Sequence, residues 1–129
     1  MRSAGQEECL PRAPLEAIQQ CLVRDANEIT ECGNCALAGD PVRCALRCEC
    51  GDPTCELPVE ATHAEYEAVR AYGSHFMIRL DHENPESSWV LCENARFAVI
   101  DVVAGDARYH VLARNPRHAW TDAHDRSRQ

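Results

Sequence analysis

Nine cysteines in 129 residues are the feature that most limits how this chain can fold. Eight of them lie in the first half, and the densest run reads CGNCALAGDPVRCALRCECGDPTC from Cys32 to Cys55. Glycine, proline and aspartate separate the thiols there, and these residues permit the tight turns by which a backbone wraps around an ion. We therefore expect the cysteines to organise the fold, either as disulfides or as metal ligands.

The rest of the sequence favours metal-binding cysteines over a disulfide framework. The cysteine count is odd, and the opening MRSAGQEECL contains no apolar stretch of the kind found in a secretory signal. No apolar run approaches the roughly 20 residues that a membrane-spanning helix needs. We expect a cytoplasmic protein with reduced thiols, the setting in which clustered cysteines bind metals.

The charged residues exclude several functional classes. All 13 basic residues are arginine, so the chain has no lysine for a Schiff base, a phosphate loop or a general base. The net charge is −8, whereas proteins that bind nucleic acid duplexes usually carry a surplus of positive charge. We therefore expect the partner to be another protein rather than nucleic acid or a membrane. The sequence indicates no oligomeric state.

The spacing of three cysteines predicts a metal site. Cys48 and Cys50 are separated by one residue, and four residues separate Cys50 from Cys55. A tetrahedral zinc ion needs a fourth ligand, preferably from a distant segment that the ion then ties down. A lone histidine in a turn is usually solvated, but beside three thiols we assign His82 as that ligand. The predicted site is therefore a structural Cys3His zinc site, with Asp81 or Glu83 accepting a hydrogen bond from the free ring nitrogen of the histidine.

Cys32, Cys35 and Cys44 form a possible second metal or redox site. A C-x-x-C pair can be metal-binding, redox-active or incidental, and this pair follows a helix rather than opening one as in thioredoxin-like sites. The three thiols could be completed by another cysteine, or they could pack as small apolar residues or stay free and oxidisable. An iron–sulfur cluster also needs four thiolates and is the less favoured cofactor. Cys21 is expected to be a buried structural thiol.

Hydrophobic periodicity predicts an α+β fold with a leading helix, a Cys-rich hairpin, a middle helix and a short antiparallel sheet. The leading helix is indicated by apolar residues at spacings of three and four, namely Leu15, Ile18, Leu22, Ala26 and Ile29. Alternating residues on either side of the turn at 51–53 predict the hairpin, with Leu46 and Cys48 before it and Cys55, Leu57 and Val59 after it.

The second half of the chain is predicted to supply the middle helix and the sheet. Thr62 and Glu65 form a capping box, and the helix that they start is expected to carry Tyr66, Val69 and Tyr72 on one side. It is expected to pack on the sheet through Tyr66 and Val69. Segments 76–80, 89–92 and 96–103 are predicted strands. A short helix after Gly105 is expected to turn Tyr109 and Leu112 inward. We expect one metal-binding domain at 14–113, between a flexible N-terminus at 1–13 and a polar tail at 114–129.

Several of these motifs together resemble a family of small uncharacterised actinobacterial proteins. They are CECGDPTC at 48–55, the helix opening EYEAVRA at 65–71, Phe76, the His82-Glu83 pair and NARFAVI at 94–100. The resemblance covers about two thirds of the chain and implies a lone domain with a metal site and no assigned reaction. The chain departs from the pattern in its additional Cys32, Cys35 and Cys44, and in Asp81, where a glycine is usual before the histidine.

The sequence favours a binding module over an enzyme. The histidines and acidic residues show no catalytic pattern, and three thiolates on zinc suppress the Lewis acidity that hydrolysis needs. The leading hypothesis is a small zinc-binding regulatory or protein-interaction module, with Trp89, Tyr109 and Trp120 as candidate contact residues. The alternative is a thiol-based redox or metal sensor, in which oxidation of the additional cysteines releases zinc.

Overall fold

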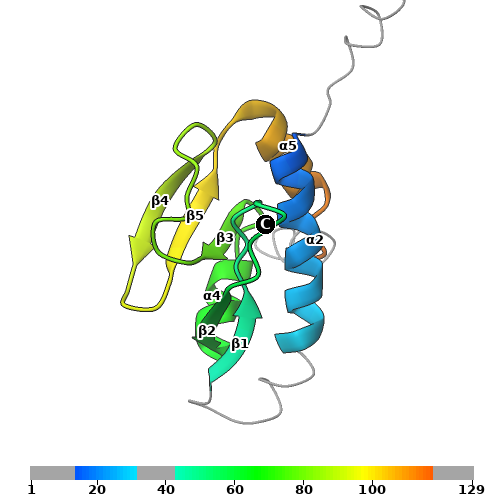
Figure 1. The fold of residues 1–129 in the computed structure, drawn as a ribbon. Coiled ribbons are helices and arrows are strands. Elements are labelled where there is room, and N and C mark those ends of the chain that lie inside the picture. Colours follow the sequence, from blue (N-terminus) through cyan, green and yellow to red (C-terminus); the bar gives the residue numbers. More distant parts are fainter. Residues whose placement is uncertain (1–13, 32–42, 118–129) are drawn as a thin grey trace, which may run out of the picture.

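The computed structural model describes residues 14–31 and 43–117, which form an α+β fold of three helices and two antiparallel sheets (Figure 1). The helices are α2 (Leu15–Thr30), α4 (His63–Arg70) and α5 (Gly105–Ala113). Strands β1 (Arg43–Arg47) and β2 (Pro58–Thr62) form a hairpin. Strands β3 (His75–Ile78), β4 (Ser88–Glu93) and β5 (Ala98–Val102) form a sheet in the order β3-β5-β4. The predicted fold class and element order are confirmed.

The middle helix α4 begins as its sequence predicts. The hydroxyl of Thr62 accepts the backbone N–H of Glu65 at 3.2 Å, and the Glu65 carboxylate accepts the backbone N–H of Thr62 at 2.9 Å. Tyr66 and Val69 are buried, and α4 packs against β2 and β3. Tyr72, predicted on the same side of this helix, does not share their burial, because α4 ends at Arg70 and the Tyr72 side chain is 62% exposed.

The hairpin carries its hydrophobic side chains on one face. Leu46 pairs with Val59 and Cys44 pairs with Ala61, and Leu46, Val59 and Ala61 are buried. This is the alternation that the sequence predicts for a half-buried strand. Leu57 is an exception, since it lies exposed just before β2 begins.

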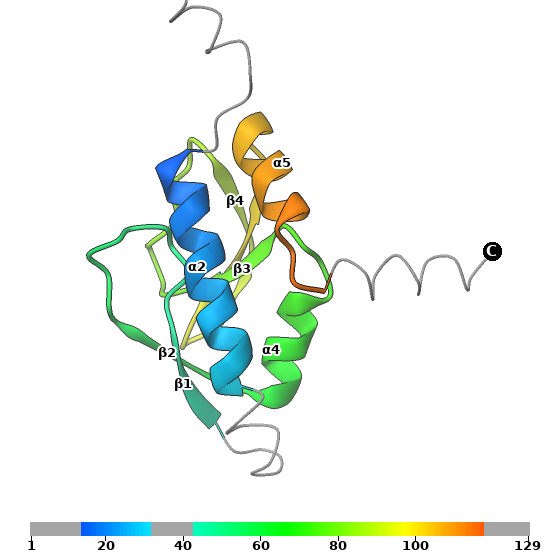
Figure 2. The same ribbon diagram turned by 90° about the vertical axis from the view of Figure 1, so that its right-hand side faces the viewer.

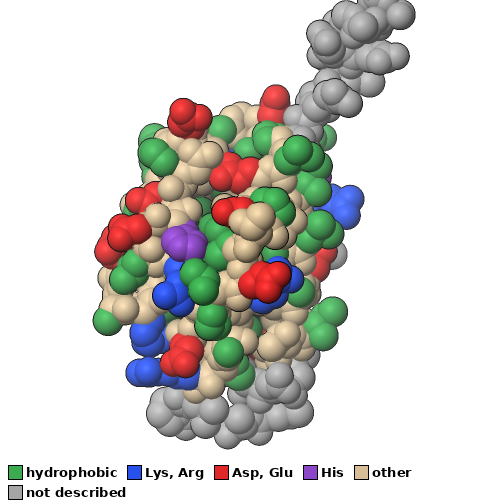
Figure 3. Space-filling view, in the orientation of Figure 1, with side chains coloured by type: hydrophobic (Ala, Val, Ile, Leu, Met, Phe, Trp, Pro, Cys, Tyr) green, Lys and Arg blue, Asp and Glu red, His purple; other side chains and the backbone are tan. Residues whose placement is uncertain are grey.

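Helix α2 does not bury the face that its hydrophobic periodicity predicts. Leu15, Leu22 and Ile29 are 83%, 58% and 75% exposed, and Ile18 is also exposed. We call these four residues the apolar stripe of α2, and Figure 3 shows hydrophobic side chains along this side of the molecule. The predicted inward orientation of the stripe is therefore wrong. The buried face of α2 instead carries Ala17, Gln20, Cys21, Val23, Arg24 and Asn27.

The polar residues on the inner face of α2 bind backbone groups that would otherwise lack partners. The Arg24 guanidinium donates to the carbonyls of Gly73 and Val111 at 2.8 and 3.1 Å. The Asn27 side chain pairs with both the N–H and the carbonyl of Arg47 at 2.9 Å. Buried backbone groups at loops and element ends need such partners, and this requirement decides which face of α2 turns inward.

Helix α5 packs beside α2, and Figure 2 shows α2, α4 and α5 in front of the three-stranded sheet. Its buried residues are Ala107 and Val111, while Tyr109 and Leu112 are exposed, so the predicted inward pair is wrong. Small side chains allow α5 to lie close to Arg24, which binds the Val111 carbonyl. Among the described residues, no helix combines the length and apolar character needed to cross a membrane.

Candidate metal centre

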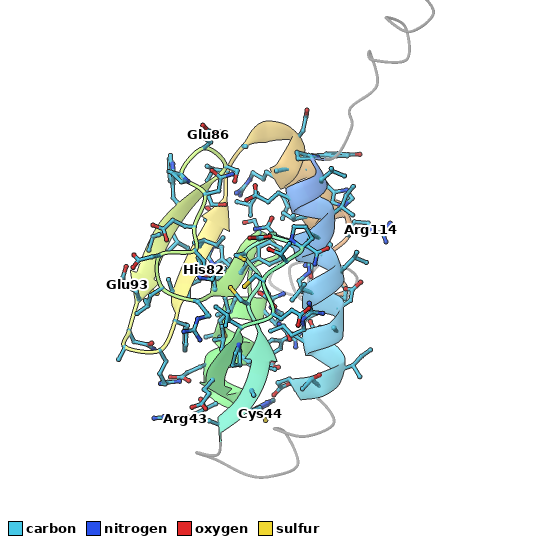
Figure 4. The ribbon with its side chains drawn as sticks, viewed as in Figure 1. Arg43, Cys44, His82, Glu86, Glu93 and Arg114 are labelled. Atoms are coloured by element: carbon cyan, nitrogen blue, oxygen red, sulfur yellow. The ribbon has the colours of Figure 1, made fainter. Side chains whose placement is uncertain are left out.

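Two segments that are distant in sequence meet at the candidate metal centre. One is the connection between β1 and β2, residues 48–57, which we call the thiolate loop and which carries Cys48, Cys50 and Cys55. The other is the turn after β3, which carries His82. One ligand atom from each of these four residues lies within 4.8 Å of the others. Figure 4 shows His82 beside sulfur atoms of the thiolate loop, and we call the four residues the Cys3His cluster.

The distances within the Cys3His cluster fit a tetrahedral ion. The Nδ1 atom of His82 lies 3.5 Å from the sulfur of Cys48 and 3.7 Å from the sulfur of Cys55. Zinc bonds of about 2.3 Å to sulfur and 2.1 Å to nitrogen place two tetrahedral ligand atoms about 3.6 Å apart. Cys48 and Cys50 are buried, while Cys55 and His82 are half-buried. The donor set and its spacing therefore suit one metal ion bound by all four side chains.

The backbone on both sides of the cluster is held by local hydrogen bonds. The N–H of Arg79 donates to the sulfur of Cys48 at 3.2 Å, which joins the end of β3 to the thiolate loop. The Asp52 carboxylate accepts the N–H and the hydroxyl of Thr54 at 2.9 and 2.8 Å, and the Asp52 carbonyl accepts the N–H of Cys55. The loop is thus a compact turn that presents its thiols to one point.

Gly51 allows the thiolate loop to approach α2. Its φ is +88°, in the left-handed region that favours glycine. A Cβ atom at this position would lie 2.4 Å from the Cγ of Glu16 and 3.0 Å from the Glu16 carbonyl oxygen. Glycine between Cys50 and Asp52 is therefore required both by the backbone conformation and by the contact with α2.

Glu49, between two of the cysteines, fixes the thiolate loop from inside. Its side chain is fully buried, and its carboxylate accepts bonds from Arg70 at 3.0 Å, from Asn27 at 2.9 Å and from the backbone N–H of Met77 at 2.9 Å. The backbone N–H of Glu49 also donates to the Met77 carbonyl at 3.0 Å. One carboxylate thereby links the loop to α2, α4 and β3, and sets the direction in which Cys48 and Cys50 point.

The thiols of Cys48 and Cys50 differ in acidity. The pKa of the Cys50 thiol is lowered to about 5, first because the Cys48 thiol donates a hydrogen bond to it and then because the backbone N–H of Asp52 does. The same bond, together with burial, raises the pKa of the Cys48 thiol. The thiolate is the form that binds metals, and the lowered pKa of Cys50 favours that form.

The other residues that the sequence predicts to have a role at this site or near it have different outcomes in the structure. Among the described residues, no hydrogen bond joins the His82 ring to Asp81 or Glu83, so the predicted acceptor role of these two is not supported. Cys44 lies in β1, away from the Cys3His cluster in Figure 4, and is half-buried. Cys32 and Cys35 lie outside the described residues. Cys21 is a buried thiol, as predicted, and burial raises its pKa.

The chain was compared with protein-family models, curated proteins and solved structures. No protein-family model, curated protein or solved structure matches the chain. The family resemblance inferred from the sequence stays a prediction. Asp81, just before His82, has a φ of +68°, in the left-handed region that is uncommon for residues other than glycine.

Sequence reasoning missed the residues that support the cluster. In the sequence, Glu49 is recognisable only as the residue that separates Cys48 from Cys50, and this spacing does not indicate that its carboxylate is buried. Its partners Asn27 and Arg70 lie on helices far away in sequence, and no local pattern connects them to the thiols. Recognising them requires the tertiary structure.

Proposed function

We propose that this chain is a small zinc-binding regulatory or protein-interaction module, with a structural zinc ion held by Cys48, Cys50, Cys55 and His82. The observation that carries the proposal is the convergence of three thiols and one imidazole at tetrahedral spacing. Zinc is the ion that such closed sets of sulfur and nitrogen ligands most commonly hold. An ion there would join the thiolate loop to the turn after β3.

A structural role for the ion is supported by the ligand set. Four protein ligands fill a tetrahedral zinc ion, whereas a catalytic zinc keeps one position for water or substrate. Thiolate charge also weakens the polarisation of a bound water. The chain is short, and metal ligation contributes folding free energy that a small core supplies only in part. We therefore propose a binding function rather than an enzymatic one.

An interaction role is supported by the apolar stripe of α2. Monomeric proteins rarely expose contiguous apolar surface unless it contacts something. At one end, Leu15 and Ile18 line a groove of about 700 Å³ whose other residues include Asp52 and His82. The groove thus joins the stripe to the Cys3His cluster. Its lining is mostly apolar, with acidic Glu16 and Asp52 and, among the described residues, no arginine, which agrees with a protein partner rather than nucleic acid.

The first experiment measures zinc and its effect on folding. Purified protein is expected to contain zinc, and removal by a chelator is expected to lower the melting temperature strongly, because a site absent from the unfolded chain couples binding to folding. His82→Ala should weaken zinc affinity, measured by competition with a chromogenic chelator, by at least about tenfold. His110→Ala, a change in a histidine of α5, should not. Zinc below about 0.2 per chain after gentle purification would contradict the proposal.

A paired substitution tests whether the apolar stripe serves contact rather than folding. Leu22 is exposed and its neighbour Val23 is 3% exposed. Leu22→Gln should change stability by less than about 0.5 kcal/mol, while Val23→Gln should cost more than about 1 kcal/mol. A large loss in Leu22→Gln would mean that the stripe is needed for the fold of the isolated chain.

The sensor alternative is favoured by one observation, the partial exposure of Cys55 within the cluster. An accessible ligand thiol can be oxidised and then leaves the ion. Treatment with a low concentration of peroxide, with zinc release followed by a chromogenic chelator, separates the two functions. Release that reverses with a thiol reductant supports a sensor, and resistance supports a structural module.

A further inference from the structure

A second group of potential metal ligands lies where the end of α2 meets α4. Glu31 follows the last residue of α2, and His63 and Glu67 stand four residues apart on α4. Residues at this spacing share one face of a helix. One ligand atom from each of the three lies within 4.8 Å of the others. The group thus brings an imidazole and two carboxylates to one point from two helices.

The burial of Glu31 requires compensation by positive charge. Its side chain is 3% exposed, and its hydrogen-bond partner among the described residues is the ring nitrogen Nδ1 of His63. The carboxylate of Glu49, by contrast, receives bonds from two side chains, one of them an arginine, and from one backbone N–H. Buried carboxylates persist when they are paired or when they coordinate a metal. Within the described part of the chain, the one imidazole compensates the charge of Glu31 less than these three donors compensate that of Glu49.

The surroundings of Glu31 add negative charge. Glu28 and Glu67 share Arg117, whose guanidinium donates to both carboxylates at 2.9 to 3.0 Å. Three carboxylates therefore lie around one guanidinium and one imidazole. Each carboxylate oxygen has two lone pairs, so the bonds from Arg117 leave Glu67 able to bind an ion. A divalent cation would add positive charge to this group of carboxylates.

The donor atoms of Glu31, His63 and Glu67 favour a different kind of metal ion than the thiols of the Cys3His cluster do. Two carboxylates and an imidazole suit first-row divalent ions such as Mn²⁺ and Zn²⁺, while thiolates select softer ions and bind Mn²⁺ poorly. The side chains of His63 and Glu67 are 44% and 40% exposed, so water can reach the open side of the group and complete the coordination.

We propose that Glu31, His63 and Glu67 form a second metal site that binds a divalent first-row ion such as Mn²⁺, independently of the Cys3His cluster.

The test uses the full chain loaded with one equivalent of zinc, so that the thiols are occupied, and titrates it with Mn²⁺. Free Mn²⁺ is followed by electron paramagnetic resonance. The expected result is one bound Mn²⁺ per chain, with affinity at least tenfold weaker in Glu31→Gln and in His63→Ala. Glu60→Gln, at an exposed glutamate of β2, and His110→Ala are the matched controls and should bind as the wild type does.

A second measurement on the wild type keeps the test independent of the folding of the variants. Substoichiometric Mn²⁺ should broaden backbone amide resonances around Glu31, His63 and Glu67 first. Broadening centred elsewhere, no saturable Mn²⁺ binding, or equal binding by the wild type and both ligand variants would each overturn the second site. None of these outcomes affects the Cys3His proposal, because that site is filled with zinc throughout.

Discussion

The Nδ1 atom of His82 lies 3.5 Å from the sulfur of Cys48, although 34 residues separate them in sequence. Between them the chain completes the thiolate loop, β2, α4 and β3. The backbone N–H of Arg79, three residues before His82, donates to the same sulfur. The contact between Cys48 and the end of β3 is therefore the point at which a metal ion would join the hairpin to the three-stranded sheet.

Gly51→Ala is expected to destabilise the protein. The added Cβ meets Glu16 at 2.4 Å in a backbone conformation with φ of +88°, so both contact and conformation oppose it. We expect a loss of at least about 2 kcal/mol in the free energy of unfolding, measured by denaturant titration. Gly105→Ala is the control, since nothing lies within 4 Å of a Cβ built there. Equal stability of the two variants would show that the approach of the loop to α2 is looser than described.

Substitutions at Asp81 should rank by their tolerance of positive φ. Its φ is +68°, a region that glycine enters freely, aspartate tolerates and β-branched residues avoid. Asp81→Gly should therefore be at least as stable as the wild type, while Asp81→Val should cost about 1–2 kcal/mol. Thermal unfolding of the three proteins tests this order. A valine variant as stable as the glycine variant would contradict it.

Glu49→Gln is expected to be among the most damaging single changes outside the four ligands. The amide keeps one acceptor oxygen, so its NH2 group would oppose either the donor of Asn27 or the donors of Arg70 and Met77. In both cases the buried guanidinium of Arg70 would lose its counter-charge. Breaking a buried ion pair in this way costs about 3–5 kcal/mol. The exposed Glu60→Gln should change the free energy of unfolding by less than about 0.5 kcal/mol. A mild effect of Glu49→Gln would mean that the carboxylate does not hold the loop.

His75 is expected to contribute a pH dependence to stability. Burial lowers its pKa from the ordinary value of 6.5, with Arg108 and Arg70 acting in the same direction and the Asp101 carboxylate opposing them. Because the folded chain then binds this proton less readily than the unfolded chain, the contribution is fully present above about pH 6.5 and is lost as the pH falls below it. Denaturant titrations at pH 7.5 and pH 5.5 should show a smaller loss in His75→Gln than in the wild type. An identical loss in both proteins would show that His75 does not contribute.

The sequence predicts those parts of the fold whose causes are local. The capping box of Thr62 and Glu65 depends on residues three apart, and the spacing of Cys48, Cys50 and Cys55 depends on one short loop. Both are present in the structure as predicted. His82 could be paired with the thiols because a tetrahedral site needs one more ligand and because it lies in a turn after a predicted strand. Its place in the His82-Glu83 pair, one of the motifs of the family resemblance, also favoured it.

The orientation of α2 could not be predicted, because its causes are distant. The exposed Leu22 has the hydrophobicity of a core residue, while Arg24 has that of a surface residue. Arg24 is buried because the carbonyls of Gly73 and Val111, 49 and 87 residues away, need donors. Helical periodicity measures only hydrophobicity along the helix and contains no information on such backbone groups.

X-ray absorption at the zinc edge tests the central claim most directly, using full-length protein with one equivalent of zinc. The account predicts a first shell of three sulfur atoms at about 2.3 Å and one nitrogen at about 2.0–2.1 Å. In His82→Ala the nitrogen should be replaced by an oxygen donor or a fourth sulfur, with the three sulfurs retained. A wild-type shell made only of oxygen and nitrogen, or a shell unchanged in His82→Ala, would contradict the assignment of Cys48, Cys50, Cys55 and His82 as the metal ligands.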